Sequence, residues 1–208
     1  MGWLKRFARP GPPAPRDDGP PSATFVESAV PGAAWIFART REDRTHSVLD
    51  LGTASEPDLR LYGRYAQRVR FADLFAGGTR GTTLAALDTV PTQPEQPYDI
   101  IFAWNIWDWL SEHEGSRVVD RLTAITAPDA RLHLVLEPAP EATIAPLEFT
   151  FLSEGRVRYR RPAHPPLPRR PLLPADVERR LEPFRIVRAL TLKTGLREYV
   201  ATREPIGP

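Results

Sequence analysis

The chain has 208 residues, of which 41% are hydrophobic, and this supports one buried core with a tail rather than two domains. Its formal net charge of +2 does not indicate nucleic-acid binding, and the absence of cysteine excludes disulfides, thiolate zinc sites and thiol nucleophiles. No segment has the ~18–20 consecutive apolar residues of a membrane helix, and the N-terminus lacks the ~7–15-residue apolar stretch of a secretion signal. We therefore expect a cytoplasmic protein.

Residues 1–22 are predicted to lie outside the folded domain. Met1–Phe7 places Trp3 and Phe7 on one side of a helical turn, either as a frayed terminus or as a hook that binds a protein partner or the domain itself. Residues 8–22 are rich in proline and glycine, which favours an extended, disordered linker. We therefore expect a hook and linker over 1–22 and one domain over 23–208.

From residue 24 onward, helix and strand patterns alternate, which is typical of α/β proteins with a mostly parallel sheet. The clearest helix begins with a capping box formed by Ser111 and Glu114, and its apolar residues recur on one face. In chain order, the predicted elements are a helix over Thr24–Arg39 interrupted near Pro31, a strand over Val48–Leu51, a helix over Pro57–Ala66, a strand over Val69–Leu74, a helix over Arg80–Leu87, a strand over Tyr98–Trp104, a helix over Ser111–Thr126 and a strand over Arg131–Leu136.

The C-terminal third begins with an insertion at about 140–174. Leu147–Arg160 alternates around Gly155 and predicts a hairpin, and the arginine- and proline-rich residues that follow predict a surface segment. The alternate arginines of the hairpin favour a solvated strand face over an RNA-binding face, and the insertion is placed to cover a crevice or to bind a partner. The last predicted elements are a helix over Pro174–Leu181 and two antiparallel strands over Arg185–Leu192 and Arg197–Thr202.

The turn after the first of the alternating strands, Asp50-Leu51-Gly52, has the form of a nucleotide-binding turn. A glycine after a buried parallel strand lets the backbone approach a ligand, although it can also simply relieve a tight turn. Asp73 lies about 20 residues further on, the spacing at which a carboxylate grips a ribose diol, and it can equally cap the turn that follows. Ser55 is placed to cap the next helix, which leaves fewer amides for a ligand.

Polar and aromatic residues crowd at the exit of the strand over Tyr98–Trp104. In open α/β sheets, ligands bind at the carboxyl ends of the strands, where this cluster sits. Asn105 is the first candidate for the substrate side, followed by Asp108 and by Glu137, which ends the next strand and is expected to face the same crevice. Trp104 is equally suited to packing and to an aromatic wall for a cationic ligand. Packing is favoured for the two remaining tryptophans, Trp107 and Trp109.

Four motifs follow one another along the chain: VLDLG at 48–52, FADL at 71–74, YDIIFAWNIWDWL at 98–110 and RLHLVLEP at 131–138. Their order is that of the class I S-adenosylmethionine-dependent methyltransferases, and the chain resembles this superfamily over most of residues 24–203. The resemblance implies a Rossmann-like α/β fold whose mostly parallel sheet is closed by an antiparallel C-terminal hairpin. Because only Phe75 to Pro97 separates the second motif from the next strand, we expect the family's third strand to be missing or vestigial.

The resemblance implies S-adenosylmethionine as the cofactor. It places the cofactor at Asp50, Gly52, Thr53, Asp73 and Trp104, and the substrate at Asn105, Asp108 and Glu137. An in-line methyl transfer needs positioning and water exclusion more than a strong acid or base, so no catalytic residue is assigned. Two functions stay open: a methyltransferase acting on a small molecule or a protein, or a non-catalytic methyltransferase-like scaffold that acts through its N-terminal hook and proline-rich arms. A nicotinamide-dependent oxidoreductase is disfavoured, because the glycine fingerprint is missing.

The histidines do not indicate a metal centre or a hydrolase. They are scattered along the chain, and their spacing fits neither a metal-ligand set nor a catalytic triad. His133 alternates inside a strand and is expected to be packed or solvated. The full set is His46, His113, His133 and His164.

Overall fold

The structure is a computed structural model, and it describes residues 24–75, 88, 92–138, 141–162, 166–170 and 172–204. The predicted hook and linker over 1–22, with Trp3 and Phe7, lie outside the described residues, as does the predicted helix over Arg80–Leu87. The hook, the linker and this helix stay predictions.

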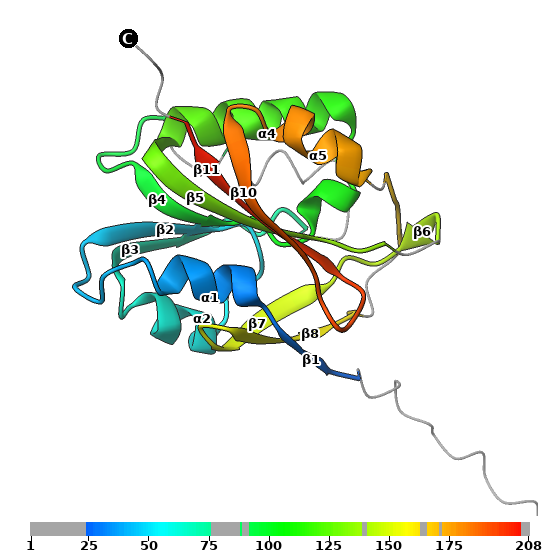
Figure 1. The fold of residues 1–208 in the computed structure, drawn as a ribbon, viewed down its shortest axis with the longest axis horizontal. Helices are drawn as coiled ribbons and strands as arrows, with labels where there is room; N and C mark the ends of the chain where they lie inside the picture. The colour runs from blue at the N-terminus through cyan, green and yellow to red at the C-terminus, as the bar shows by residue number, and fades with distance from the viewer. Residues whose placement is uncertain are drawn as a thin grey trace, which may run out of the picture.

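A sheet of six strands forms the central layer of the described residues (Figure 1). Its strands are β2 (His46–Asp50), β3 (Ala66–Phe71), β4 (Tyr98–Phe102), β5 (Thr126–Leu136), β10 (Phe184–Thr191) and β11 (Arg197–Arg203). They lie side by side in the order β10-β11-β5-β4-β2-β3, and within the described residues the sheet ends at β3. β2 to β5 are parallel, whereas β11 is antiparallel to both of its neighbours. The predicted α/β fold with an antiparallel C-terminal hairpin is confirmed.

Helices cover both faces of the sheet (Figure 1). They are α1 (Pro31–Phe37) and α2 (Glu56–Tyr62) on one face, and α4 (Glu112–Ile125) and α5 (Pro174–Leu181) on the other. The central strands are therefore buried on both sides: the neighbours Val48 and Leu49 are both fully buried but belong to different hydrophobic cores. None of the helices in the described ranges is long and apolar enough to cross a membrane.

A second, three-stranded sheet lies on the α1 and α2 side of the molecule. Its strands are β1 (Val26–Ala29), β7 (Glu148–Ser153) and β8 (Arg156–Arg160). The hairpin of β7 and β8 confirms the prediction for 147–160, and β1 pairs antiparallel with the other edge of β8. The predicted helix over Thr24–Arg39 is therefore wrong in its first half: β8 offers these residues backbone partners, and Pro31 then starts the helix at its first turn. A short pair, β6 (Thr143–Ile144) with β9 (Leu167–Pro168), completes the insertion.

The boundaries of two other predicted elements shift. The helix predicted over Pro57–Ala66 ends at Tyr62, because Ala66 already pairs with β2 as the first residue of β3. β5 begins at Thr126, directly after α4, rather than at Arg131, and Tyr98 pairs with Thr126 before a register shift. In both cases a partner strand adds residues that local pattern alone assigns to a helix or a turn.

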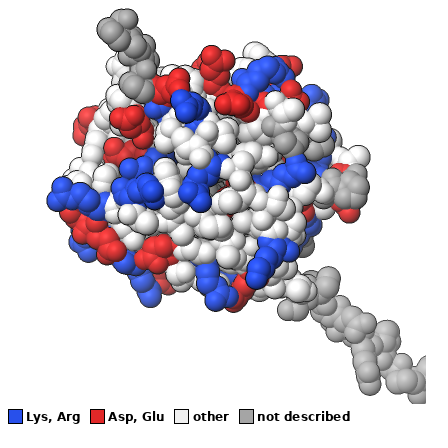
Figure 2. All heavy atoms as spheres, viewed as in Figure 1, with Lys and Arg blue, Asp and Glu red and all other residues white. Residues whose placement is uncertain are grey.

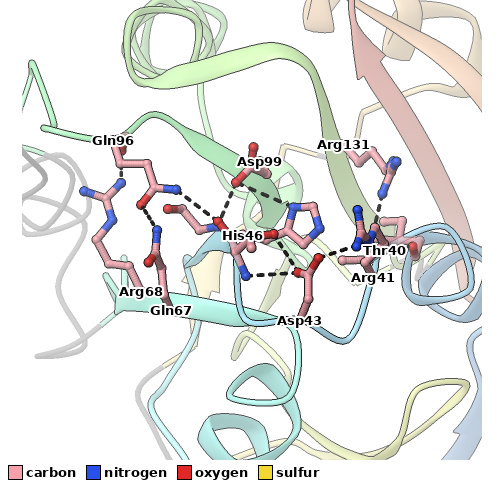
Figure 3. Close-up of polar contacts among 12 residues, drawn as sticks. Thr40, Arg41, Asp43, His46, Gln67, Arg68, Gln96, Asp99 and Arg131 are labelled. Carbon is pink, nitrogen blue, oxygen red and sulfur yellow. Dashed lines mark hydrogen bonds and ion pairs between the residues drawn. The ribbon is translucent and has the colours of Figure 1, made fainter.

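The amino-terminal edge of the parallel strands is closed by polar contacts (Figure 3). The carboxylate of Asp99 accepts a 2.7 Å hydrogen bond from the backbone N–H of Ser47, which ties the start of β4 to β2. The side-chain amide of Gln96 donates to the carbonyl of Thr45 at 3.1 Å and accepts from Gln67 at 2.7 Å. These contacts tie the strand ends to one another at this edge of the sheet.

The charged side chains of the described surface are mixed in sign. Figure 2 shows Lys and Arg interspersed with Asp and Glu over the face that carries β10, β11 and α1. Arg156 and Arg160 of β8 form ion pairs with Glu27 at 2.7 Å and with Glu148 at 2.8 Å. This pairing agrees with the solvated strand face expected for the basic hairpin.

The capping box of α4 gives a direct test of a predicted element. Ser111 Oγ accepts from the N–H of Glu114 at 3.2 Å, and the Glu114 carboxylate accepts from the N–H of Ser111 at 2.7 Å. Ser111→Ala is expected to lower the free energy of unfolding by about 1 kcal/mol, as measured by urea denaturation. Ser116→Ala, an exposed substitution within the same helix, serves as the control. An equal loss in both variants would contradict a capping role for Ser111.

Candidate functional site

A cavity of about 240 Å³ lies at the carboxyl ends of β2, β3 and β4. One side is formed by the turns that follow these strands, and the other by the insertion, through residues such as Leu147 and Phe149. Five of the eight predicted site residues meet here: Gly52, Thr53, Asp73, Trp104 and Asn105. The position is that at which open α/β sheets bind ligands.

Asp73 and Thr53 form the polar end of this cavity. The hydroxyl of Thr53 donates to Asp73 Oδ2 at 2.7 Å, and the N–H of Phe75 donates to Asp73 Oδ1 at 2.8 Å. The second contact shows that Asp73 does cap the turn after β3. A carboxylate has about four lone-pair sites, so these two bonds leave about two sites for hydroxyl groups of a ligand.

Asn105 contributes an unsatisfied donor. Its side chain is 1% exposed, and its Nδ2 is buried with no hydrogen-bond partner among the residues that the structure describes. A buried donor without a partner costs about 1–3 kcal/mol. Since Asn105 also lines the cavity, a ligand acceptor there would recover this cost.

The side chain of Trp104 occupies part of the site. Its backbone has φ 45°, a left-handed conformation that costs a bulky residue about 1–3 kcal/mol. The strain is held by a hydrogen bond from Nε1 to Asp50 Oδ1 at 2.7 Å and by a parallel stack on Phe149, with ring centroids 4.9 Å apart. A Cβ on Gly52 would lie 2.8 Å from Trp104 Cδ1, so glycine is required here for the indole to pack. The cavity is consequently smaller than the ~300–1,000 Å³ common for ligand sites.

Asp50 lies behind the wall of the cavity rather than in it. Its carboxylate is 1% exposed and accepts hydrogen bonds from the N–H of Gly52 at 2.8 Å and from the hydroxyl of Tyr62 at 2.5 Å, in addition to the bond from Trp104. Burial raises the pKa of Asp50 to about 7, although the hydrogen bonds favour the ionised form. Its contacts hold the strand-exit turn and the indole in place.

Asp108 and Glu137 belong to a network of hydrogen bonds and ion pairs outside this cavity. Asp108 accepts from the N–H of Glu137 at 2.9 Å and lies 3.3 Å from the guanidinium of Arg169, and burial raises the pKa of Asp108 to about 6. Glu137 forms a 2.5 Å ion pair with Arg161 and lines a neighbouring cavity, so it does not face the crevice of Asn105 as expected. The prediction of a surface segment is also wrong for Arg169, whose side chain is fully buried because it neutralises Asp108.

The other two tryptophans that follow β4, Trp107 and Trp109, pack as predicted. Trp107 and Trp109 are 1% and 3% exposed. The ring of Trp107 lies against the first turns of α4, 3.5 Å from where a Cβ on Gly115 would be. Trp109 makes an edge contact with Phe75, with ring centroids 5.6 Å apart. Both rings therefore serve to fix the exit of β4.

A buried pair between β5 and β11 was not predicted from the sequence. His133 Nε2 lies 2.8 Å from Glu198 Oε1, and both side chains are fully buried. The same carboxylate accepts from the backbone N–H groups of Gly32 at 2.8 Å and Ala33 at 3.1 Å, at the start of α1. One feature of the sequence pointed to this contact. The first turn of α1 has no acidic residue and no side-chain cap, so the N–H groups at the start of α1 need an acceptor from elsewhere in the chain.

Comparison with known proteins finds similarity in structure alone. No protein-family model and no curated protein sequence matches the chain. The structure of DhpI in complex with S-adenosylhomocysteine aligns with TM-score 0.52 at 16% identity, over 83% of this chain and 83% of that one. The 1,6-didemethyltoxoflavin-N1-methyltransferase of Burkholderia thailandensis aligns with TM-score 0.50 at 15% identity, over 84% and 77%. The pyocyanin biosynthetic protein PhzM aligns with TM-score 0.45 at 16% identity over 82% of this chain, which spans just over half, 54%, of PhzM.

Proposed function

Because this chain has the fold of the class I S-adenosylmethionine-dependent methyltransferases, we propose that it transfers a methyl group from S-adenosylmethionine to an acceptor molecule. The observation that carries the proposal is the cavity at the carboxyl edge, which brings the hydroxyl of Thr53 and the carboxylate of Asp73 together with the unpartnered amide of Asn105. These groups converge from three strand ends, although about 50 residues of chain separate the first from the last.

The side chains that line the cavity fit the parts of this cofactor. The lone-pair sites left on Asp73 suit a ribose diol, and the turn at Gly52 and Thr53 suits the amino-acid end. When bound, S-adenosylmethionine supplies an electrophilic methyl group for in-line displacement. We assign Asp50 to positioning, since it holds Trp104 and Gly52 without lining the cavity.

Catalysis by this chain then consists of positioning and water exclusion. Leu147 and Phe149 are buried apolar walls of the cavity, and Asn105 is placed to orient an acceptor atom at the end of β4. Restricting two reactants to a near-attack geometry supplies much of the rate of such a displacement without a strong acid or base. The bound 1,6-didemethyltoxoflavin and S-adenosylhomocysteine of the Burkholderia enzyme support a small-molecule acceptor.

The proposal is tested by calorimetric titration with S-adenosylmethionine and S-adenosylhomocysteine. We expect the protein to bind both, and Asp73→Ala to weaken binding at least about tenfold, because the diol loses two hydrogen bonds to a carboxylate. Asp120→Ala removes an exposed carboxylate from the middle of α4 and is expected to leave binding unchanged. Equal affinities in the two variants would argue against a role for Asp73 in binding the cofactor.

One observation favours the non-catalytic scaffold as a second candidate. The indole of Trp104 covers Gly52, where a cofactor would otherwise approach the backbone. If the folded protein gives no heat with either ligand at millimolar concentration, the enzymatic proposal fails. Pull-down experiments with and without residues 1–22 would then test the scaffold.

A further inference from the structure

A second cavity, of about 390 Å³, lies beside the proposed cofactor cavity. It is formed by β8, the end of β5 and the turn between β10 and β11, which come together in Figure 1. Leu147 lines both cavities, and the ion pair of Glu148 with Arg160 joins them, because Glu148 lines the first and Arg160 the second. The two spaces therefore adjoin at Leu147.

About half of the residues that line the second cavity are apolar or aromatic. Leu147 and Leu196 are buried, and the ring of Tyr159 is half-buried. Val26 and Pro138 add further apolar surface. Such walls favour a ligand with a ring or another apolar body over a fully polar one.

The charged side chains of this cavity differ in how many hydrogen bonds they make. Glu137 is neutralised by Arg161 at 2.5 Å, and Arg161 also donates to the carbonyl of Ala145. Arg160 contacts Glu148 through Nε alone, at 2.8 Å. Its two terminal amino groups have no hydrogen-bond partner in the described part of the chain. The guanidinium of Arg160 is half-exposed and has donors to spare.

We propose that the second cavity binds the methyl acceptor, and that this acceptor is a small molecule with an apolar ring and a carboxylate that is anchored by Arg160. The inference rests on the proposed function, since it names the acceptor class of the same reaction. A planar carboxylate matches the two-donor edge of a guanidinium. A doubly charged phosphate is disfavoured, because the carboxylates of Glu137 and Glu148 lie close by.

The position of Leu147 between the two cavities then defines how the bound acceptor is oriented. With its carboxylate at Arg160, the nucleophilic end points towards Leu147 and the first cavity. There a lone pair of an acceptor oxygen or nitrogen forms the bond to the methyl carbon. The carbon–sulfur bond breaks with its electron pair on sulfur, which gives S-adenosylhomocysteine, and the acceptor proton leaves to water.

The test uses 6-hydroxy-2-naphthoate and its uncharged amide as probes, with binding measured by calorimetry on the full chain. We expect the naphthoate to bind about tenfold more tightly than the amide, since an arginine–carboxylate contact is worth at least about 1.4 kcal/mol. Arg160→Ala is expected to reduce naphthoate binding to the level of the amide. Arg156→Ala, on the same face of β8 and also paired with a glutamate, is expected to have no effect.

Three results would overturn the inference: equal binding of naphthoate and amide, equal affinity in Arg160→Ala and the parent protein, or no binding of either probe. Titration of the same proteins with S-adenosylhomocysteine separates this outcome from failure of the proposed function. If S-adenosylhomocysteine binds while the naphthoate does not, the acceptor class is wrong and the methyltransferase proposal stands. If the naphthoate binds through Arg160 and S-adenosylhomocysteine does not, the anion site stands and the methyltransferase proposal fails.

Discussion

Glu198→Ala is expected to lower the free energy of unfolding by about 3–5 kcal/mol, the cost of removing one member of a fully buried, hydrogen-bonded pair. The carboxylate serves three donors: His133 Nε2–H at 2.8 Å and the backbone N–H groups of Gly32 and Ala33. Alanine leaves all three donors buried without a partner and removes the only carboxylate that faces the start of α1 among the described contacts. Guanidinium denaturation at pH 7 measures the loss.

The pH dependence of this loss provides a second readout. Burial opposes ionisation of Glu198, but the hydrogen bond and charge of His133 and the two backbone amides outweigh it, so the pKa is lowered below the ordinary 4.5. A lowered carboxyl pKa stabilises the folded state above the unfolded value, and this contribution disappears as the pH falls through the folded value. The difference between parent and variant is therefore expected to persist down to about pH 4.5 and to shrink below it.

Glu204, just beyond the opposite end of β11, provides a control for Glu198. Glu204→Ala removes an exposed carboxylate, 3.5 Å from Arg185, and is expected to change stability by less than about 0.5 kcal/mol. If Glu198→Ala does not fold, Glu198→Gln keeps one acceptor oxygen and is expected to fold with a smaller loss. A Glu198→Ala protein as stable as Glu204→Ala would show that the buried pair does not contribute to stability.

Asp50→Asn is expected to make the protein more stable than the parent at pH 8 and not at pH 4. Burial raises the pKa of Asp50 from 3.8 to about 7, so the folded protein holds this proton more tightly than the unfolded chain. A raised pKa gives stability that is fully present below the unfolded value and is lost as the pH rises through the folded value. Three pKa units correspond to about 4 kcal/mol. Asparagine does not titrate, and its oxygen can accept the bonds from Gly52 and Trp104.

The measurement is urea denaturation of both proteins at several pH values from 4 to 8. The stability of the variant relative to the parent is expected to rise through this range by a few kcal/mol. Asp50→Ala serves as the matched comparison: it also removes the titration, but leaves the N–H of Gly52 and the indole N–H of Trp104 without their acceptor. A constant difference between Asp50→Asn and the parent would show that Asp50 is ionised throughout.

Local signals in the sequence predicted the central sheet and the place of the cavity. Apolar runs bounded by turn residues located β2, β4 and β5, and the end of each run fixed which residues sit at the carboxyl edge. Gly52, Asp73 and Asn105 therefore met in one cavity, although the contacts that each makes there were not predictable. The caps of α2 and α4 were equally visible, because Ser55 and Ser111 act on backbone groups only three residues away.

The features that escaped prediction depend on partners far away in the chain. Residues 26–29 form a strand only because the edge of β8 is available to them. Arg169 is buried only because Asp108, on another loop, needs a cation. Trp104 adopts a left-handed backbone because Asp50 and Phe149 hold its ring. Local periodicity carries no information about such contacts, since tertiary packing overrides local preference.

β1 and α1 both depend on partners that are synthesised long after them. β1 pairs with β8, with Val26 opposite Tyr159, and α1 is capped by Glu198. The parallel strands between them need only nearby helices and strands, and such local contacts form early in folding. A nascent chain that stops before residue 156 contains neither partner, so β1 and α1 have nothing to pair with on the ribosome. Binding by chaperones and cleavage by proteases are therefore expected to concentrate on this segment until β11 is complete.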